Sequence, residues 1–302
     1  MKILLTGANG FLGRYIKEHF KKSNVLETLG RSSKYNHNCD LAIEIPELSK
    51  DIEIVIHTAG KAHSVPKTLL EKQAFFDVNY KGTQNLLLGL EKCQSLTKAF
   101  VFISSVAVYG RENGVNIPED AHLFTKEPYG LSKIQAEQLV LNWCKRNNVV
   151  CTILRLPLLV GANPPGNLGA MIKGIKRGYY FNIAEGRAQK SMVLASDVAQ
   201  CILKVSEIGG IYNLTDGYHP TFNELSRTIS LQLGRNFIPN MPLFFAKVLA
   251  KIGDFIGDRF PINSSKLSKI MSPLTFDDTK ARKAFGWNPA PVLDGFKIQE
   301  NA

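Results

Sequence analysis

The first thirteen residues constrain the fold of this chain more than any other feature. Lys2–Thr6 has the short, continuous hydrophobicity of a buried strand, and glycines follow at Gly7, Gly10 and Gly13. Phe11–Lys22 then has helical spacing. Glycines allow a tight turn and a close approach of the backbone, and the first turn of a helix offers unpaired N–H groups with a partial positive charge. This strand–turn–helix unit predicts a site for the phosphates of a dinucleotide.

The rest of the first half repeats the alternation of apolar strands and amphipathic helices. Further strands are expected over Val25–Leu29, Asp51–Thr58, Ala99–Ser104 and Val149–Leu156, and helices over Phe75–Lys92 and Tyr129–Arg146. Continuously apolar strands that alternate with helices indicate a parallel sheet covered on both faces. The sequence therefore predicts a doubly wound α/β fold (Rossmann type), whose ligands bind beyond the carboxyl ends of the strands.

The regular alternation of strands and helices ends at about residue 157. Helices are expected over Asn167–Arg177, Asp197–Val205, Thr221–Leu233 and Pro242–Ile256, with one strand at Ile211–Leu214. We predict a dinucleotide-binding domain at 1–160 and a smaller, helix-rich substrate domain at 161–302, with elements able to interleave between them. Pro242–Ile256 is apolar with two lysines, so it can pack on the protein or lie on a membrane surface.

Composition excludes several classes of protein. The 302 residues are 44% hydrophobic and 21% charged, values that are ordinary for a globular chain. The formal charge of +11 is spread along the sequence without a nucleic-acid-binding motif, so no nucleic-acid partner is predicted. Five cysteines without a C-x-x-C pair predict neither disulfides nor a metal site. No apolar run reaches the ~18 residues that span a bilayer, and we expect a soluble, cytoplasmic protein.

A second motif is Tyr129-x-x-x-Lys133 at the start of a predicted helix. Residues i and i+4 share one helix face, so the phenol and the ammonium can converge. A nearby ammonium favours the phenolate, and we expect it to lower the pKa of Tyr129 and to make this residue a usable acid/base. A tyrosine and a lysine on the surface of a helix would give the same pattern.

A third motif, Ser104-Ser105-Val106-Ala107-Val108-Tyr109-Gly110, closes a predicted strand. A hydroxyl at the carboxyl end of a strand can hydrogen-bond a substrate oxygen in an open α/β sheet. His57 also ends a strand, and we expect it to be a structural imidazole. His63 is a candidate substrate contact because it lies in the following loop. Trp143 and Trp287 are expected in the core.

In this order, the three motifs resemble the extended short-chain dehydrogenase/reductase family, and within it the nucleotide-sugar epimerases and dehydratases. The resemblance covers residues 1 to about 292. Further matching segments are His57–Gly60, Val78–Thr83, Leu154–Pro157 and Asp277–Pro289.

The resemblance implies roles for particular residues. The pyrophosphate of NAD or NADP would lie on Gly7, Asn9, Gly10, Phe11 and Leu12. The remainder of the cofactor would meet Asp40, Leu41, Ala59, Gly60, Asn79 and Pro157. Tyr129 would be the acid/base, Lys133 would hold the ribose, and Ser105 would be the catalytic hydroxyl. The substrate would meet Ser105, Val106, Asn167, Leu168, Arg187 and Lys190. Relatives often have Arg–Ser where this chain has Lys190-Ser191, and lysine lacks the bidentate fork of arginine.

The resemblance leaves the reaction open between a 4-epimerase, which is placed first, and a 4-ketoreductase for 4-keto-6-deoxy sugars. Dehydratases of this branch carry Asp-Glu after the catalytic hydroxyl, whereas Val106-Ala107 cannot transfer protons. A non-catalytic NADP(H)-binding regulator is the alternative of another class. A nucleotide sugar of a polysaccharide pathway is the expected substrate, and a homodimer is expected by resemblance.

The second predicted strand bears on the choice of cofactor. NAD enzymes usually place an acid at its tip, where it binds the ribose 2′-OH, but this strand ends in Gly30-Arg31-Ser32. Arg31 and Ser32 can accept a 2′-phosphate instead. The sequence thus favours NADP.

Overall fold

The predicted doubly wound α/β fold is confirmed in the computed structural model, which describes residues 1–21, 25–62, 64–257, 260 and 262–298. A seven-stranded parallel sheet has the order β11-β7-β5-β4-β1-β2-β3. Its strands are β1 (Lys2–Thr6), β2 (Val25–Gly30), β3 (His37–Asn38), β4 (Ile54–His57), β5 (Ala99–Ser105), β7 (Val150–Leu156) and β11 (Gly210–Asn213). The strand order reverses between β1 and β4, which is where such sheets bind their ligands.

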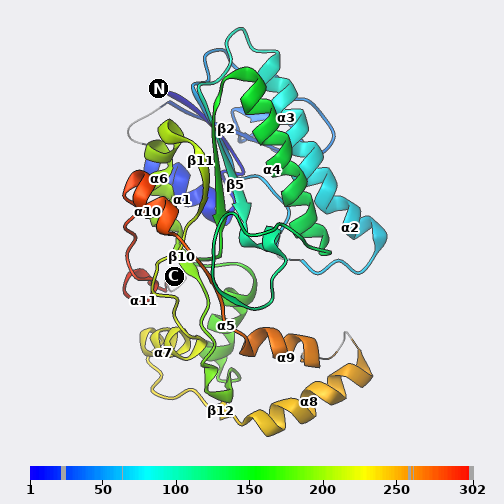
Figure 1. The fold of residues 1–302 in the computed structure, drawn as a ribbon, viewed down its shortest axis with the longest axis vertical. Helices are drawn as coiled ribbons and strands as arrows, with labels where there is room; N and C mark the ends of the chain where they lie inside the picture. The colour runs from blue at the N-terminus through cyan, green and yellow to red at the C-terminus, as the bar shows by residue number, and fades with distance from the viewer. Residues whose placement is uncertain (22–24, 63, 258–259, 261, 299–302) are drawn as a thin grey trace.

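Helices cover both faces of this sheet (Figure 1). On one face, α1 (Phe11–Phe20) and α6 (Ala195–Ile208) pack Ile16 and Ile202 onto the strands. On the other face, α3 (Gly82–Glu91) and α4 (Pro128–Asn147) contribute Leu86 and Trp143. Successive residues of a strand point to opposite faces, so β1 can serve both cores.

The long helix expected over Phe75–Lys92 is three segments. They are α2 (Leu69–Phe76), a π-helical turn at Asp77–Lys81, and α3. A π-turn shifts the register of the following helix, and such turns often mark functional sites. Asn79 lies within this turn and is buried.

Many elements of the second half of the chain lie in the lower part of the view in Figure 1. The helices α5 (Gly166–Arg177), α7 (Phe222–Gln232) and α11 (Val292–Gly295) share one core with β8 (Leu158–Val160) and β10 (Met192–Leu194). A smaller core joins α8 (Leu243–Ile256) and α9 (Ser264–Met271) to β9 (Asn182–Ile183) and β12 (Asn240–Met241). β6 (Gly114–Ile117) pairs with β13 (Leu274–Phe276).

Residues beyond 160 return to the large sheet. β11 is its edge strand beside β7, and α6 and α10 (Thr279–Phe285) pack in the core that contains α1. Elements from both sides of residue 160 therefore share the large sheet and its core. None of the helices in the described ranges has the length and apolarity needed to cross a membrane.

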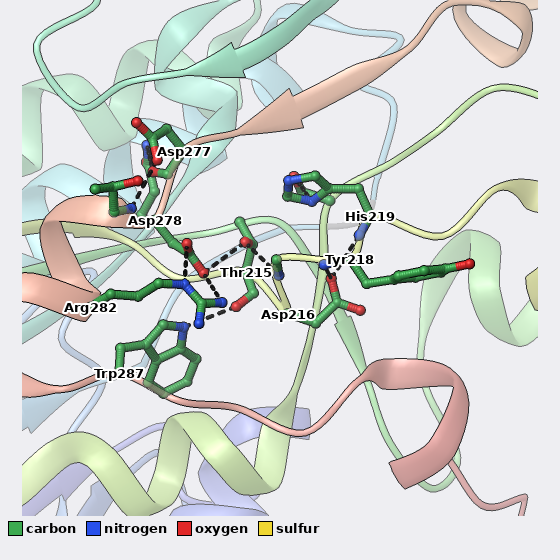
Figure 2. Close-up of polar contacts among 12 residues, drawn as sticks. Thr215, Asp216, Tyr218, His219, Asp277, Asp278, Arg282 and Trp287 are labelled. Carbon is green, nitrogen blue, oxygen red and sulfur yellow. Dashed lines mark hydrogen bonds and ion pairs between the residues drawn. The ribbon is translucent and has the colours of Figure 1, made fainter.

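The closing segment is tied to the end of β11 by polar contacts (Figure 2). Asp278 accepts hydrogen bonds from Thr215 Oγ1 at 3.1 Å and from Arg282 Nε at 2.8 Å. The indole of Trp287 donates to the carbonyl oxygen of Thr215 at 2.9 Å. Trp287 and Trp143 are both buried, as expected for core residues. The Asp277–Pro289 motif thus anchors the chain to the sheet.

Candidate functional site

The turn between β1 and α1 requires its glycines for different reasons. Gly7 has φ +70°, and a Cβ there would lie 2.6 Å from Thr58 Oγ1 and 2.7 Å from the Ala59 amide nitrogen. A Cβ on Gly13 would collide with the carbonyl oxygen of Gly7. Gly10 caps α1 without a side-chain hydrogen bond, and the first turn holds no acidic residue. The N-terminus of α1 is therefore an uncapped, electropositive end, as anion binding requires.

The predicted pyrophosphate residues fall into two groups. Asn9 and Gly10 are exposed at the turn. Leu12 is buried in the sheet core, and Phe11 packs at its edge against Tyr15. Because its side chain is buried, Leu12 would contact a ligand through its backbone N–H.

The loop after β4 approaches the same turn. Thr58 Oγ1 donates to the Thr6 carbonyl oxygen at 2.6 Å, and the Ala59 N–H donates to Thr6 Oγ1 at 3.1 Å. A Cβ on Gly60 would lie 3.0 Å from Asn79 Oδ1 and 3.4 Å from Lys133 Nζ. Ala59, Gly60, Asn79 and Lys133, which the sequence places far apart, therefore meet at the switch point of the sheet.

The side chain of Asn79 fixes this meeting point. Its Oδ1 accepts the Lys61 N–H at 2.7 Å, and its Nδ2 donates to the Lys61 carbonyl at 3.1 Å and to Ser132 Oγ at 2.9 Å. The π-turn thereby links the β4 loop to α4. Sequence reasoning did not identify Ser132, whose position inside the Tyr129–Lys133 motif was the available signal.

His57 is fully buried between two hydroxyls. Its Nδ1 lies 2.7 Å from Thr6 Oγ1 and its Nε2 lies 2.9 Å from Thr83 Oγ1. Burial, followed by the nearby Lys133 ammonium, lowers the pKa of His57 to about 3. A neutral imidazole held at both nitrogens is the structural role that the sequence predicted. His63 lies outside the described residues.

Three side chains on one face of α4 interact with residues near the carboxyl end of β5. Tyr129 shares a hydrogen bond with Ser105, and Lys133 Nζ donates to the Ile103 carbonyl at 2.8 Å. Glu137 accepts a hydrogen bond from Ser104 Oγ. The helix positions i, i+4 and i+8 thus face one strand. The joint action of Tyr129, Lys133 and Ser105 stays a prediction.

The electrostatics of this face differ from the sequence expectation. Burial raises the pKa of Tyr129 above its usual value, and the hydrogen bond with Ser105 opposes that shift without cancelling it. The prediction that Lys133 lowers the pKa of Tyr129 is therefore wrong for the structure as it stands. Burial lowers the pKa of Lys133 itself to about 8, and Glu137 acts in the opposite direction. The Lys133 ammonium lies over the ring of Phe102, 4.6 Å from its centroid.

A buried ion pair below this face was also absent from the sequence reasoning. Arg155 donates to Glu137 through Nη2 at 2.8 Å and through Nε at 3.2 Å, and both side chains are at most 3% exposed. Arg155 Nη1 continues to the Tyr109 hydroxyl at 3.0 Å, and this hydroxyl donates to Asn213 Oδ1 at 2.8 Å. The network joins α4 to β7 and β11. Its signal in the sequence was Glu137, four residues after Lys133.

The predicted nucleoside end of the site lies beside β2. Arg31 is exposed and Ser32 is half-buried just after that strand. The acid within β2, Glu27, is engaged elsewhere by Lys2 and by His37. Asp40 accepts the Ala42 N–H at 3.1 Å, and Leu41 is buried with its carbonyl bound by Asn85 at 2.8 Å. Pro157 is half-buried between β7 and β8.

The predicted substrate residues are more dispersed. Asn167 is exposed in the first turn of α5, whereas the Leu168 side chain is buried in the core of that end of the molecule. Val106 is half-buried directly after Ser105. Arg187 is exposed beside a cavity of about 580 Å³ and pairs with Glu185. Lys190 Nζ donates to the carbonyls of Lys269 and Ser272 at 3.0 and 2.8 Å, so it caps the end of α9.

Comparison with known proteins identifies the family. Residues 3–215 match the NAD dependent epimerase/dehydratase family. The chain is 24% identical to UDP-glucose 4-epimerase of Vibrio cholerae, covering 98% of this chain and 93% of that protein. It is 26% identical to N-acetyl-alpha-D-glucosaminyl-diphospho-ditrans,octacis-undecaprenol 4-epimerase of Escherichia coli O157:H7, covering 93% of this chain and 89% of that protein.

Solved structures share the fold. UDP-glucose 4-epimerase of Thermotoga maritima, solved with UDP-glucose, aligns with a TM-score of 0.75 at 20% identity, covering 98% of this chain and 96% of that chain. RMD from Pseudomonas aeruginosa, solved with NADPH, aligns with a TM-score of 0.70 at 20% identity, covering 97% of this chain and 94% of that chain. The resemblance inferred from the motifs is confirmed: the chain belongs to the NAD-dependent epimerase/dehydratase family and is an NAD(P)-dependent enzyme of the epimerase and oxidoreductase type.

Proposed function

We propose that this protein is a nucleotide-sugar 4-epimerase that acts by reversible oxidation at C4 of the sugar. The proposal is supported by the arrangement of Tyr129 beside Ser105 and of Lys133 beside Gly60, on one face of α4 next to β5. The epimerase relatives support the choice of reaction.

The residues at the switch point fit a dinucleotide. The uncapped start of α1 and the glycine turn would hold its pyrophosphate, and Gly60 leaves the space beside Asn79 and Lys133 that a side chain would fill. Lys133 would hold the ribose. When bound, the nicotinamide supplies the exchange of hydride with the sugar carbon.

Tyr129 would move the proton. Oxidation at C4 removes the proton of the C4 hydroxyl, and reduction returns it, so a group that alternates between phenolate and phenol is needed. The Ser105 hydroxyl would donate a hydrogen bond to the C4 oxygen or to the phenolate. Its own Oγ accepts the Ala107 N–H at 3.2 Å, which fixes its position.

Dehydration is disfavoured by the residues after Ser105. Loss of the C6 hydroxyl requires an acid and a base beside the sugar. Val106 and Ala107 supply neither.

The alternative to an epimerase that would use the same residues is an NADPH-dependent 4-ketoreductase. The exposed Arg31 and the engagement of Glu27 by Lys2 and His37 favour a cofactor with a 2′-phosphate. A reductase relative, GDP-6-deoxy-D-mannose reductase of Pseudomonas aeruginosa, is 26% identical over 74% of this chain and 77% of that protein.

The experiment separates these functions by cofactor and product. Purified protein is denatured and the released dinucleotide is identified by mass spectrometry. The native enzyme is then incubated with UDP-glucose, UDP-N-acetylglucosamine and undecaprenyl-diphospho-N-acetylglucosamine. A 4-epimer formed without added cofactor supports the epimerase. NADPH consumption with a nucleotide 4-keto-6-deoxy sugar, and no epimer, supports the reductase. No turnover on any of these substrates, with NADP(H) bound, supports a regulator.

A further inference from the structure

Helix α8 packs on the protein with its smallest residues. Ala246, Ala250 and Gly253 follow the i, i+4, i+7 spacing of one helix face and are buried. Ala246 and Ala250 share a small core with Leu267 and Ile270 of α9. Gly253 approaches the Ile262 carbonyl so closely that a Cβ would overlap it. This face of α8 is therefore fixed against the protein.

The opposite face of α8 carries large apolar side chains in solvent. At 100° per residue, Phe244, Val248 and Phe255 lie opposite the buried stripe, with Phe245, Ile252 and Ile256 beside them. Phe255 is 96% exposed, Phe244 71% and Phe245 59%. Soluble helices normally turn such residues inward, and a continuous exposed apolar face indicates an interaction surface.

The charges of α8 lie where an anionic surface would meet them. Lys247 and Lys251 are exposed along one edge of the apolar face. The acidic residue of the helix, Asp254, is exposed between the lysine edge and the buried stripe, and its carboxylate accepts hydrogen bonds from the N–H and hydroxyl of Ser264. The chain as a whole has a formal charge of +11, which favours the approach of a negatively charged surface.

The position of α8 leaves the surface accessible. Figure 1 shows α8 at the extremity of the molecule, away from the large sheet and its helices. A flat partner can therefore reach the helix without meeting the rest of the protein.

We propose that α8 is an interfacial helix that binds this enzyme to an anionic lipid bilayer. Phe244, Phe255 and their neighbours would enter the boundary between headgroups and acyl chains, and Lys247 and Lys251 would meet the headgroup phosphates. The proposal concerns the location of the enzyme at a membrane surface and does not depend on which sugar it binds.

The test measures binding of the full-length protein to vesicles of phosphatidylcholine with and without phosphatidylglycerol, by co-sedimentation. We expect binding to the anionic vesicles. The double variant Phe244→Ser/Phe255→Ser should lower the partition coefficient by about tenfold or more, because two exposed phenyl rings no longer enter the bilayer. Lys247→Gln/Lys251→Gln should weaken binding to the anionic vesicles and reduce its dependence on salt. Ile208→Ser/Leu231→Ser, which removes exposed apolar side chains of α6 and α7, is the matched control and should bind like the wild type.

Circular dichroism and thermal unfolding establish that each variant is folded, which is expected because the changed side chains are exposed. The proposal is overturned if the folded wild type does not sediment with anionic vesicles, or if Phe244→Ser/Phe255→Ser binds them as well as the wild type. Light scattering provides a further check. A fall in molecular mass for that variant would show that the face is covered by a second copy of the chain, which also overturns the proposal.

Discussion

At the scale of single residues, the site depends on an amine in an unusual environment. Lys133 is buried, donates to the Ile103 carbonyl and lies over the Phe102 ring. Burial lowers its pKa from 10.5 to about 8, despite the opposing effect of Glu137. The charge of a lysine with a pKa near 8 responds to small changes in its surroundings.

This shift predicts how stability depends on pH. Between about pH 8 and pH 10.5 the unfolded chain holds the Lys133 proton more tightly than the folded chain, so this residue makes stability rise with pH. Relative to Lys133→Met, which lacks the titrating group, the wild type should gain about 2 kcal/mol of unfolding free energy from about pH 7.5 to about pH 9.5. Urea denaturation of both proteins at the two pH values measures the difference. An unchanged difference would show that Lys133 has its ordinary pKa when folded.

At the scale of elements, the β1–α1 unit depends on glycines whose roles differ from those of other glycines in the chain. Gly13 of α1 has no space for a Cβ, because the Gly7 carbonyl occupies it. Gly82 of α3 is also helical, and a Cβ there would meet Leu41 and Asp77 at ordinary contact distances of 3.5 and 3.6 Å.

The same substitution should therefore have opposite effects at the two positions. Gly13→Ala forces the turn to move and should cost about 2–3 kcal/mol of stability, with a loss of dinucleotide binding. Gly82→Ala should be neutral or stabilising by up to about 1 kcal/mol, because alanine restricts the unfolded chain. Denaturant unfolding and titration with NAD(P)H give both readouts. Equal losses at the two sites would contradict the close approach at Gly13.

The sequence predicted six of the seven strands of the large sheet and the helices α1 and α4 to α8, because the period of their apolar residues is strong. It did not predict the short strands outside that sheet or the helices α9 to α11. It predicted one helix over Phe75–Lys92, since a π-turn leaves no mark in hydrophobic spacing, although this turn carries Asn79. The i+4 rule placed Tyr129 and Lys133 on one face of the helix that starts at Pro128. It could not give the pKa of Tyr129, because desolvation depends on the tertiary packing around the hydroxyl. The side-chain partners of Asn79 and Arg155 likewise come from segments that are distant in sequence.

At the scale of the whole molecule, elements after residue 160 pack with those before it. The sequence suggested a division there because the regular alternation of strands and helices ends. β11 pairs with β7, and α6 covers the sheet opposite α3 and α4. Asn213 of β11 accepts from Tyr109 and donates to the Ile117 carbonyl at 3.1 Å, so it completes the buried network.

A fragment of residues 1–160 should therefore not fold by itself. It lacks the apolar residues of α6, including Val198, Ile202 and Val205, and would leave one sheet face and the β7 edge uncovered. We expect no cooperative thermal transition for the fragment, whereas a fragment of residues 1–216 should regain part of it. Cooperative unfolding of the shorter fragment would contradict this account of the core.

The whole account depends on Tyr129 as the proton-transferring group beside a bound dinucleotide. Turnover and dinucleotide affinity of Tyr129→Phe test it most directly, with Tyr218→Phe, an exposed tyrosine bonded to Glu224, as the control. The account predicts that Tyr129→Phe lowers kcat by about 10²–10⁴-fold while the dinucleotide Kd stays within about threefold, and that Tyr218→Phe changes neither. Undiminished kcat in folded Tyr129→Phe would contradict it.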